Sequence, residues 1–284
     1  MSSAPASDLY LPVPGALLRY RDEGSGPPVL LIHGWTLDLD MWEPQVAALA
    51  GFRLVRLDRR GFGLSSGRGS VNADVQDVLT LCDRLELGRL ACVGMSQGAR
   101  VALHLCRVAP ERLACVVLDG PPRGLADDAD ADADADADAA GQDVPLSEYR
   151  ALIARGDLAT FRRAWLAHPL MQLQSSDPQA RALLDRMTAR YRGEDLLQNL
   201  TAAPPPSSRP LLSSLATPAL IVTGERDLPA RVRAADALAA ALPRAERAII
   251  PSARHMPSLD NPRAYNPVLR AFLERCAGPR PQET

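Results

Sequence analysis

The chain has 284 residues, of which 46% are hydrophobic and 23% are charged, and its formal net charge is −2. A chain of this length can bury an extensive apolar core, either as one large domain or as a domain with an insertion. Basic and acidic residues are interspersed, whereas nucleic acids select for clustered positive charge, so we expect no nucleic-acid partner. All the basic residues are arginines, which excludes mechanisms that need a lysine Schiff base.

Cysteines and apolar stretches bear on the compartment. The five cysteines form no CxxC pair, and four of them lie in apolar runs; they are Cys82, Cys92, Cys106, Cys115 and Cys276. Buried, reduced thiols are typical of a cytoplasmic protein. The amino-terminal residues do not combine a basic patch with an apolar core, and no apolar stretch approaches the ~20 residues of a membrane helix. We therefore expect a cytoplasmic protein with no secretory signal and no membrane partner.

Apolar runs and amphipathic segments alternate along the first part of the chain. The apolar runs cover residues 28–34, 52–58, 89–94 and 112–120. The segments between them carry apolar residues at positions i, i+3 and i+4, which is the period of a helix packed on one face. Continuous apolar strands that alternate with such helices are typical of a parallel sheet covered on both faces. The sequence therefore predicts an α/β fold.

This alternation stops after residue 120 and resumes with a strand pattern that begins near residue 217. We assign residues 1–122 and 212–284 to the core and residues 123–211 to an inserted helical cap. Residues 126–141 are built of alternating aspartate and alanine, which predicts a disordered loop because the charges repel and little apolar area is available. The calcium-loop spacing is missing there, so we expect no metal site. The helical remainder of the insertion would cover the sheet edge as a lid.

The segment Gly94-Met95-Ser96-Gln97-Gly98 lies between an apolar run and a helical pattern. In a strand-to-helix turn of this kind, a nucleophile adopts a strained backbone that only small flanking residues permit. The turn would place Ser96 at the positive end of a helix, with the Gln97 N–H directed at a developing oxyanion. These features indicate that Ser96 is a nucleophile.

A serine hydroxyl needs a general base and a carboxylate that orients the base. Asp227 follows the strand pattern in "ALIVTGERD", and His255 follows the last strand pattern in "AIIPSARH". Parallel strands would deliver all three side chains to one sheet edge, where ligands of open α/β sheets bind. Asp119, at the end of "VVLDG", is an alternative carboxylate. In the first strand-to-helix turn, the backbone N–H of Trp35 is the second predicted oxyanion donor, and His33 is expected to be structural.

These segments resemble the α/β-hydrolase fold superfamily along nearly the whole chain outside the aspartate–alanine run. The resemblance implies an eight-stranded, mostly parallel sheet flanked by helices, an inserted cap and a Ser-Asp-His triad of Ser96, Asp227 and His255. The serine separates the chain from haloalkane dehalogenases and epoxide hydrolases, which carry aspartate there. Within the serine members it is similar to enol-lactonases, small carboxylesterases, carbon–carbon bond hydrolases and cofactor-free haloperoxidases. Met256 and Ala99 depart from the carbon–carbon hydrolase pattern.

The substrate pocket is expected where the cap faces the strand-to-helix turn of Gly94 to Gly98, which we call the elbow. Its predicted residues are Met95, Phe161, Trp165, Met187 and Tyr191, although apolar stripes of this kind are more often core. His104 and His168 are interpreted as a helix-packing residue and a cap residue without a catalytic role. The run of Asp58, Arg59 and Arg60 is expected to hold a loop.

Two classes of function follow from these residues. The first is a serine hydrolase that cleaves an ester or lactone of a small, largely apolar substrate, with no cofactor. Carbon–carbon bond hydrolysis and perhydrolysis would use the same triad. The second is a ligand-binding, receptor-like protein that keeps the fold and the capped pocket.

Overall fold

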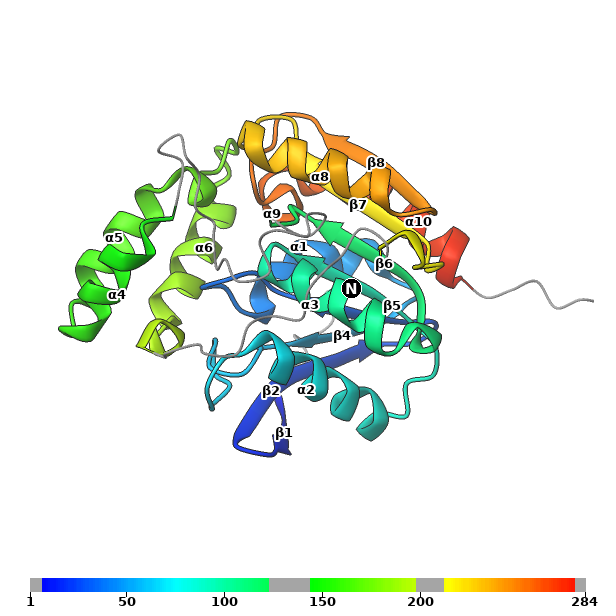
Figure 1. Ribbon diagram of the computed structural model, residues 1–284, viewed down its shortest axis with the longest axis horizontal. Coiled ribbons are helices and arrows are strands. Elements are labelled where there is room, and N and C mark those ends of the chain that lie inside the picture. Colours follow the sequence, from blue (N-terminus) through cyan, green and yellow to red (C-terminus); the bar gives the residue numbers. More distant parts are fainter. Residues whose placement is uncertain (1–6, 123–143, 198–211, 279–284) are drawn as a thin grey trace, which may run out of the picture.

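A computed structural model describes residues 7–122, 144–197 and 212–278 of the chain. The aspartate–alanine run at 126–141 lies outside the described residues. Within these ranges, eight strands form one sheet in the order β1-β2-β4-β3-β5-β6-β7-β8 (Figure 1). The strands are β1 (Leu9–Val13), β2 (Ala16–Gly24), β3 (Pro28–Ile32), β4 (Arg53–Leu57), β5 (Leu90–Met95), β6 (Leu113–Asp119), β7 (Ala219–Gly224) and β8 (Ala245–Ile250).

The six strands from β3 to β8 are mutually parallel in their pairings, and only the pairs β1–β2 and β2–β4 are antiparallel. The parallel strands are apolar on both faces because both faces are covered. Two consecutive residues of β3 illustrate this, since Leu31 belongs to one buried cluster and Leu30 belongs to the other. The α/β fold class with a mostly parallel eight-stranded sheet is therefore confirmed.

Helices cover the two faces of the sheet. The helices α2 (Val71–Arg84), α3 (Gln97–Val108) and α8 (Pro229–Ala241) contribute to the cluster that contains Leu30. The helix α10 (Pro262–Ala277) contributes to the cluster that contains Leu31. Short helices complete the core, namely η1 (Leu39–Trp42), α1 (Glu43–Val46), η2 (Ala47–Leu49), η3 (Pro110–Arg112) and α9 (Pro257–Asp260). No helix in the described ranges is long and apolar enough to cross a membrane.

Between β6 and β7 the chain forms a separate group of helices, at the left of Figure 1. They are α4 (Leu146–Ala154), α5 (Leu158–Ala167), η4 (Pro169–Met171), α6 (Pro178–Arg190) and η5 (Glu194–Leu197). Asp157 and Asp177 cap α5 and α6 by accepting a hydrogen bond from a first-turn backbone N–H. Apolar residues of these helices join the cluster of Leu31, and α6 packs against η1. We refer to the helices α4 to η5 as the cap.

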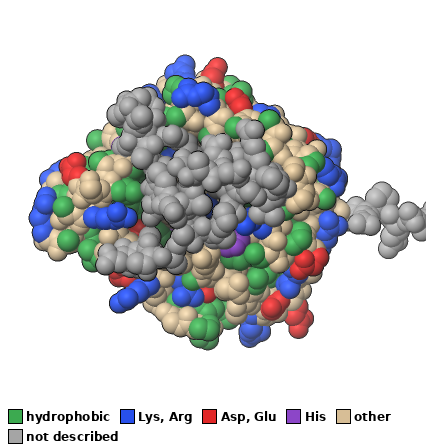
Figure 2. Space-filling model, in the orientation of Figure 1, with side chains coloured by type: hydrophobic (Ala, Val, Ile, Leu, Met, Phe, Trp, Pro, Cys, Tyr) green, Lys and Arg blue, Asp and Glu red, His purple; other side chains and the backbone are tan. Residues whose placement is uncertain are grey.

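The charged side chains and the cysteines are distributed as the sequence predicts, with the two signs of charge mixed and most thiols buried. On the face shown in Figure 2, arginine and acidic side chains are interspersed around the rim. Four of the cysteines are buried, and Cys276 is half-buried.

Candidate active site

Ser96 lies between β5 and α3 in a backbone conformation with φ 49° and ψ −114°. A residue with a side chain rarely adopts this conformation, so neighbouring contacts must hold it. The Ser96 N–H donates a hydrogen bond to the carbonyl of Asp119 at 2.7 Å, and the Ser96 carbonyl accepts one from Ala99 N–H at 2.8 Å. The neighbouring strand β6 and the first turn of α3 thus fix the serine.

The two glycines around Ser96 are required by close backbone packing. A Cβ added to Gly94 would lie 2.2 Å from the carbonyl oxygen of Gly98. A Cβ added to Gly98 would lie 2.3 Å from the carbonyl oxygen of Ile32, at the end of β3. Because the obstructing atoms are backbone atoms, no side-chain rotation relieves these contacts. The G-x-S-x-G spacing therefore lets α3 begin directly against two strands.

Three side chains meet at the carboxyl ends of β5, β7 and β8. His255 Nε2 lies 3.3 Å from Ser96 Oγ, and His255 Nδ1 lies 3.1 Å from Asp227 Oδ2. The other carboxylate oxygen of Asp227 accepts a hydrogen bond from the Leu228 N–H at 2.7 Å. Asp227 and His255 are both buried. The sequence-predicted trio is thus brought together as one chain of hydrogen-bonding groups.

Asp119 lies near the same histidine without bonding to it. A Cβ on its neighbour Gly120 would be 3.1 Å from the His255 ring. Burial raises the pKa of Asp119 to about 8. The nearby Ser258 and Tyr265 hydroxyls lower this pKa, but their effect is smaller than that of burial. Asp119 therefore stays largely protonated at neutral pH, and Asp227 is the carboxylate within hydrogen-bonding distance of His255.

The turn after β3 approaches the serine from the other side. A Cβ added to Gly34 would lie 3.5 Å from Ser96 Cβ, so the turn that carries Trp35 adjoins the turn that carries Ser96. Gln97 is the first residue of α3, where N–H groups have no acceptor within the helix. The backbones of Trp35 and Gln97, the two predicted oxyanion donors, thus flank Ser96.

His33 is a fixed structural group in this turn. Its Nδ1 lies 2.7 Å from the carbonyl oxygen of Gly34, and its Nε2 accepts the Arg59 N–H at 2.9 Å. Burial, with a contribution from the Arg59 cation, lowers the pKa of His33 to about 3. The imidazole is therefore neutral, which matches one nitrogen donating and the other accepting.

The run of Asp58, Arg59 and Arg60 serves the loops around the site. Asp58 accepts the backbone N–H groups of Leu39 and Leu64, both at 2.8 Å. Arg59 pairs with buried Asp74 at 2.6 Å, and Arg60 pairs with Asp77. Arg59 also donates to the side-chain oxygen of Gln97 at 2.7 Å. These hydrogen bonds and ion pairs hold the loops around the site in place, which is a structural role.

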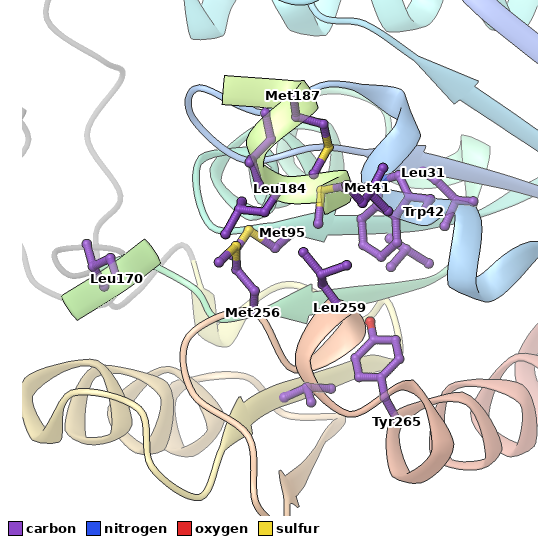
Figure 3. Close-up of a cluster of buried hydrophobic side chains, with 14 of the residues drawn as sticks. Leu31, Met41, Trp42, Met95, Leu170, Leu184, Met187, Met256, Leu259 and Tyr265 are labelled. Atoms are coloured by element: carbon purple, nitrogen blue, oxygen red, sulfur yellow. The ribbon is translucent and has the colours of Figure 1, made fainter. Parts of the chain in front are cut away.

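The five predicted pocket residues are all buried in one apolar cluster. Figure 3 shows Met95 and Met187 in this cluster together with Met41 and Met256. The aromatic members surround Trp35, whose ring lies 4.8 Å from Trp165, 5.9 Å from Tyr191 and 6.3 Å from Phe161 between centroids. His168 stacks on Trp165 in the cap. His104 is half-buried on α3, and no recorded hydrogen bond joins it to Ser96, Asp227 or His255.

Thr36 and Asp195 are residues that the sequence analysis missed. Trp165 donates its indole N–H to Thr36 Oγ1 at 2.7 Å, and Trp35 donates its indole N–H to Asp195 Oδ2 at 2.7 Å. Both bonds join the cap to the turn after β3. No local sequence pattern predicts these two hydrogen bonds, because the bonded residues are separated by 129 and 160 positions in the sequence.

A serine, an aspartate and a histidine in this chain order, at the carboxyl edge of a mostly parallel eight-stranded sheet, define the class of α/β hydrolases. The family model of the alpha/beta hydrolase fold matches residues 27–262, which is most of the chain. The chain therefore belongs to the alpha/beta hydrolase fold family.

Several relatives of the chain are named as esterases or lactonases. The pimeloyl-[acyl-carrier protein] methyl ester esterase of Nitrosomonas europaea is 28% identical over 256 residues, which cover 88% of this chain and 97% of that protein. A thermophilic esterase from Thermogutta terrifontis superposes with a TM-score of 0.78 at 26% identity, over 96% of this chain and 100% of that one. The enol-lactonase from Burkholderia xenovorans LB400 superposes with a TM-score of 0.76 at 25% identity, over 93% and 99% of the two chains.

Proposed function

We propose that the protein is a serine hydrolase that cleaves a carboxylic ester or lactone through an acyl-enzyme. The observation that carries the proposal is the hydrogen-bonded series in which His255 lies 3.3 Å from Ser96 Oγ and 3.1 Å from Asp227 Oδ2. The names of the esterase and lactonase relatives support the same reaction class.

The first half of the reaction forms the acyl-enzyme. Ser96 Oγ attacks the carbonyl carbon while His255 Nε2 accepts the hydroxyl proton. Asp227 holds the Nδ1–H side of the imidazole and stabilises the imidazolium that forms. The backbone N–H groups of Trp35 and Gln97 donate to the oxyanion of the tetrahedral intermediate. When that intermediate collapses, His255 returns the proton to the departing alcohol oxygen.

The second half regenerates the enzyme with water. His255 accepts a proton from a water molecule as that water attacks the acyl carbon. Collapse of the second intermediate releases the carboxylic acid, and the proton goes back to Ser96 Oγ. In a lactone the alcohol and the acid remain joined in one hydroxy-acid product.

The surroundings of Ser96 favour a largely apolar substrate. The chain has six methionines, and five of them belong to the cluster that contains Met95, namely Met41, Met95, Met171, Met187 and Met256. Unbranched thioether side chains adjust to apolar groups of different shape. We propose that Met95 and Met187, with the aromatic group of Phe161, Trp165 and Tyr191, contact the apolar part of the substrate under a cap spanning residues 123–211.

Replacement of the nucleophile tests the proposed function. Ser96→Ala should reduce turnover of p-nitrophenyl acyl esters and of lactones by about 10⁴-fold or more, since the attacking oxygen is lost. The matched control is Ser147→Ala on α4, where the serine is exposed and turnover should stay at the wild-type value.

A fluorophosphonate probe gives a second measurement. The wild-type protein and Ser147→Ala should be labelled, and Ser96→Ala should not. Turnover retained by Ser96→Ala would contradict the proposal. A wild-type protein that neither labels nor hydrolyses any ester or lactone would instead favour the ligand-binding class.

A further inference from the structure

Two indole hydrogen bonds join the cap to the turn after β3. Trp35 Nε1–H donates to Asp195 on η5 at 2.7 Å, and Trp165 Nε1–H of α5 donates to Thr36 Oγ1 at 2.7 Å. The bonds run in opposite directions, since one donor belongs to the turn and the other to the cap. Adjacent residues of the turn are thus each held by a different element of the cap.

The turn residue held by α5 has an unfavourable backbone. Thr36 has φ 62°, and its side chain is branched at Cβ, which makes left-handed backbone a genuine outlier. Thr36 is also buried, with 1% of its surface exposed. The bond from Trp165 is therefore an interaction that keeps Thr36 in place against local preference.

The acceptor on η5 is built to hold the other turn residue. Asp195 uses both carboxylate oxygens, one for Trp35 and one for the Tyr191 hydroxyl at 2.6 Å. The Trp35 ring is packed edge-on against Trp165 and Phe161, so the cap also limits its rotation. Both the polar atom and the ring of Trp35 are thereby fixed from the cap side.

From these contacts we infer that Asp195 and Trp165 are positioning residues for the oxyanion site. By holding Trp35 and Thr36, they keep the peptide unit between Gly34 and Trp35 directed at the substrate oxygen. This inference rests on the proposed serine-hydrolase function. It gives the cap a part in transition-state stabilisation in addition to the contact proposed between Trp165 and the substrate.

The expected size of the effect follows from known geometric sensitivities. Loss of one oxyanion donor typically lowers kcat by about 10²-fold to 10³-fold. Misplacement rather than loss of the donor should have a smaller effect, so each broken bond should lower kcat by about 10-fold. KM should change by less than about threefold, because the oxyanion contact is strongest in the transition state and because the variant at Trp165 keeps an aromatic ring for the apolar part of the substrate.

A double-mutant cycle tests the bond between Trp165 and Thr36. Trp165→Phe removes the indole N–H and keeps an aromatic ring, while Thr36→Val removes the acceptor and keeps the shape. If the bond carries the effect, each single variant and the double variant should show the same loss of kcat. Losses that multiply in the double variant would show that the two residues act separately, and would overturn the inference.

Asp195→Leu provides an independent variant, because leucine accepts no hydrogen bond from Trp35. An alkylboronic acid is the probe of the oxyanion site, since its tetrahedral adduct with Ser96 mimics the intermediate. The inhibition constant of the boronic acid should rise by the same factor as kcat falls in Trp165→Phe, Thr36→Val and Asp195→Leu. An unchanged inhibition constant would mean that the variants act elsewhere, and the inference would fail.

Arg192→Gln is the matched control for a general loosening of the cap. Arg192 joins the cap to the core by donating to the carbonyls of Gly63 and Ser65 at 2.7 and 2.8 Å, and it also pairs with exposed Glu194 at 2.9 Å. None of these recorded bonds involves Trp35 or Thr36. Its kcat should stay within twofold of the wild-type value. If the wild-type protein hydrolyses esters and Trp165→Phe, Thr36→Val and Asp195→Leu do so equally well, only this inference is wrong. If the wild-type protein shows no hydrolysis and no fluorophosphonate labelling, both proposals are wrong.

Discussion

Two aspartates at the ends of neighbouring strands differ in what their side chains contact. Asp227 follows β7 and lies 3.1 Å from His255, whereas Asp119 ends β6 and stays protonated because burial raises its pKa to about 8. A protonated, buried carboxyl cannot stabilise an imidazolium as a carboxylate does. The residue-level chemistry of the site therefore depends on which of two similar side chains reaches the histidine.

Isosteric amides separate the two aspartates. Asp227→Asn should lower kcat for an ester substrate by about 10⁴-fold, because an amide cannot hold the required imidazole tautomer and charge. Asp119→Asn should keep kcat within about threefold of the wild-type value, since it replaces one neutral group by another. Steady-state kinetics at pH 7, where Asp119 is largely protonated, measure both variants. A larger loss of kcat in Asp119→Asn than in Asp227→Asn would mean that Asp119 is the carboxylate that orients His255.

The juxtaposition of Ser96, Asp227 and His255 could be predicted because each of them follows an apolar strand pattern at a parallel-sheet edge. Asp119 was an alternative to Asp227 because "VVLDG" and "VTGERD" both end a strand with an acid. The choice depends on a 3.1 Å distance that no linear pattern contains. Thr36 and Asp195 were missed for a related reason, since their roles arise from contacts across the fold.

At the level of elements, the junction of β5 and α3 is defined by backbone-to-backbone packing. Gly98 lies against the end of β3, where an added Cβ would be 2.3 Å from the Ile32 carbonyl oxygen and 2.6 Å from that of His33. The helix can only make room by moving away from the strands. Such a movement would shift Ser96 relative to the turn that carries Trp35.

Gly98→Ala should lower the free energy of unfolding by about 3 kcal/mol, at the upper end of the cost of overpacking a core. It should also reduce ester turnover in the protein that remains folded. Gly88→Ala is the control, because nothing lies within 4 Å of an added Cβ there. Urea unfolding measures both variants. Equal stabilities of the two variants would contradict this account of the elbow.

The elements themselves were predicted with uneven success. The apolar runs at 28–34 and 89–94 correspond to β3 and β5, because buried parallel strands are continuously apolar. The antiparallel strands β1 and β2 were not recognised as strands from the pattern, since β2, which lies next to the edge strand β1, mixes charged residues with apolar ones. The helix expected after β3 is divided into η1, α1 and η2; Pro44 lies in the first turn of α1, and both α1 and η2 pack against α10.

For the whole molecule, an arginine–aspartate network attaches the cap to the core. Arg190, at the end of α6, pairs with Asp38 at 2.7 Å and with Asp40 at 2.6 Å. Burial, with the nearby Asp58 charge, raises the pKa of Asp38 to about 7. Asp38 therefore requires its arginine most at alkaline pH, where the carboxyl is ionised.

Arg190→Gln should destabilise the protein by about 3 kcal/mol at pH 8.5, because it leaves a buried carboxylate without its cation. Below pH 7 the loss should shrink, since Asp38 takes up a proton and the unpaired charge disappears. Arg275→Gln is the control, because its pair with Glu246 is exposed and should contribute less than about 1 kcal/mol. Urea unfolding at pH 5.5 and 8.5 measures both. A loss that does not depend on pH would contradict the assignment to Asp38.

The overall architecture could be predicted because alternating strands and helices leave few topologies, and because the elbow and the strand ends converge on one edge. The boundaries of the cap at 123 and 211 stay a prediction. Which cap residues contact the turn could not be predicted, because helical periodicity shows that a helix has an apolar face but not what that face meets.

The separation of the sheet into two buried clusters has a consequence for how the protein can diversify. Neighbouring positions of one strand, such as Leu30 and Leu31, belong to different clusters, and only the cluster of Leu31 continues into the cap and the methionines beside Ser96. Substitutions at one set of positions therefore act on the packing next to Ser96 and the cap, whereas substitutions at the alternate set act on the packing of α2, α3 and α8 on the opposite face. A mutant library aimed at altered substrate preference should randomise every second position of these strands.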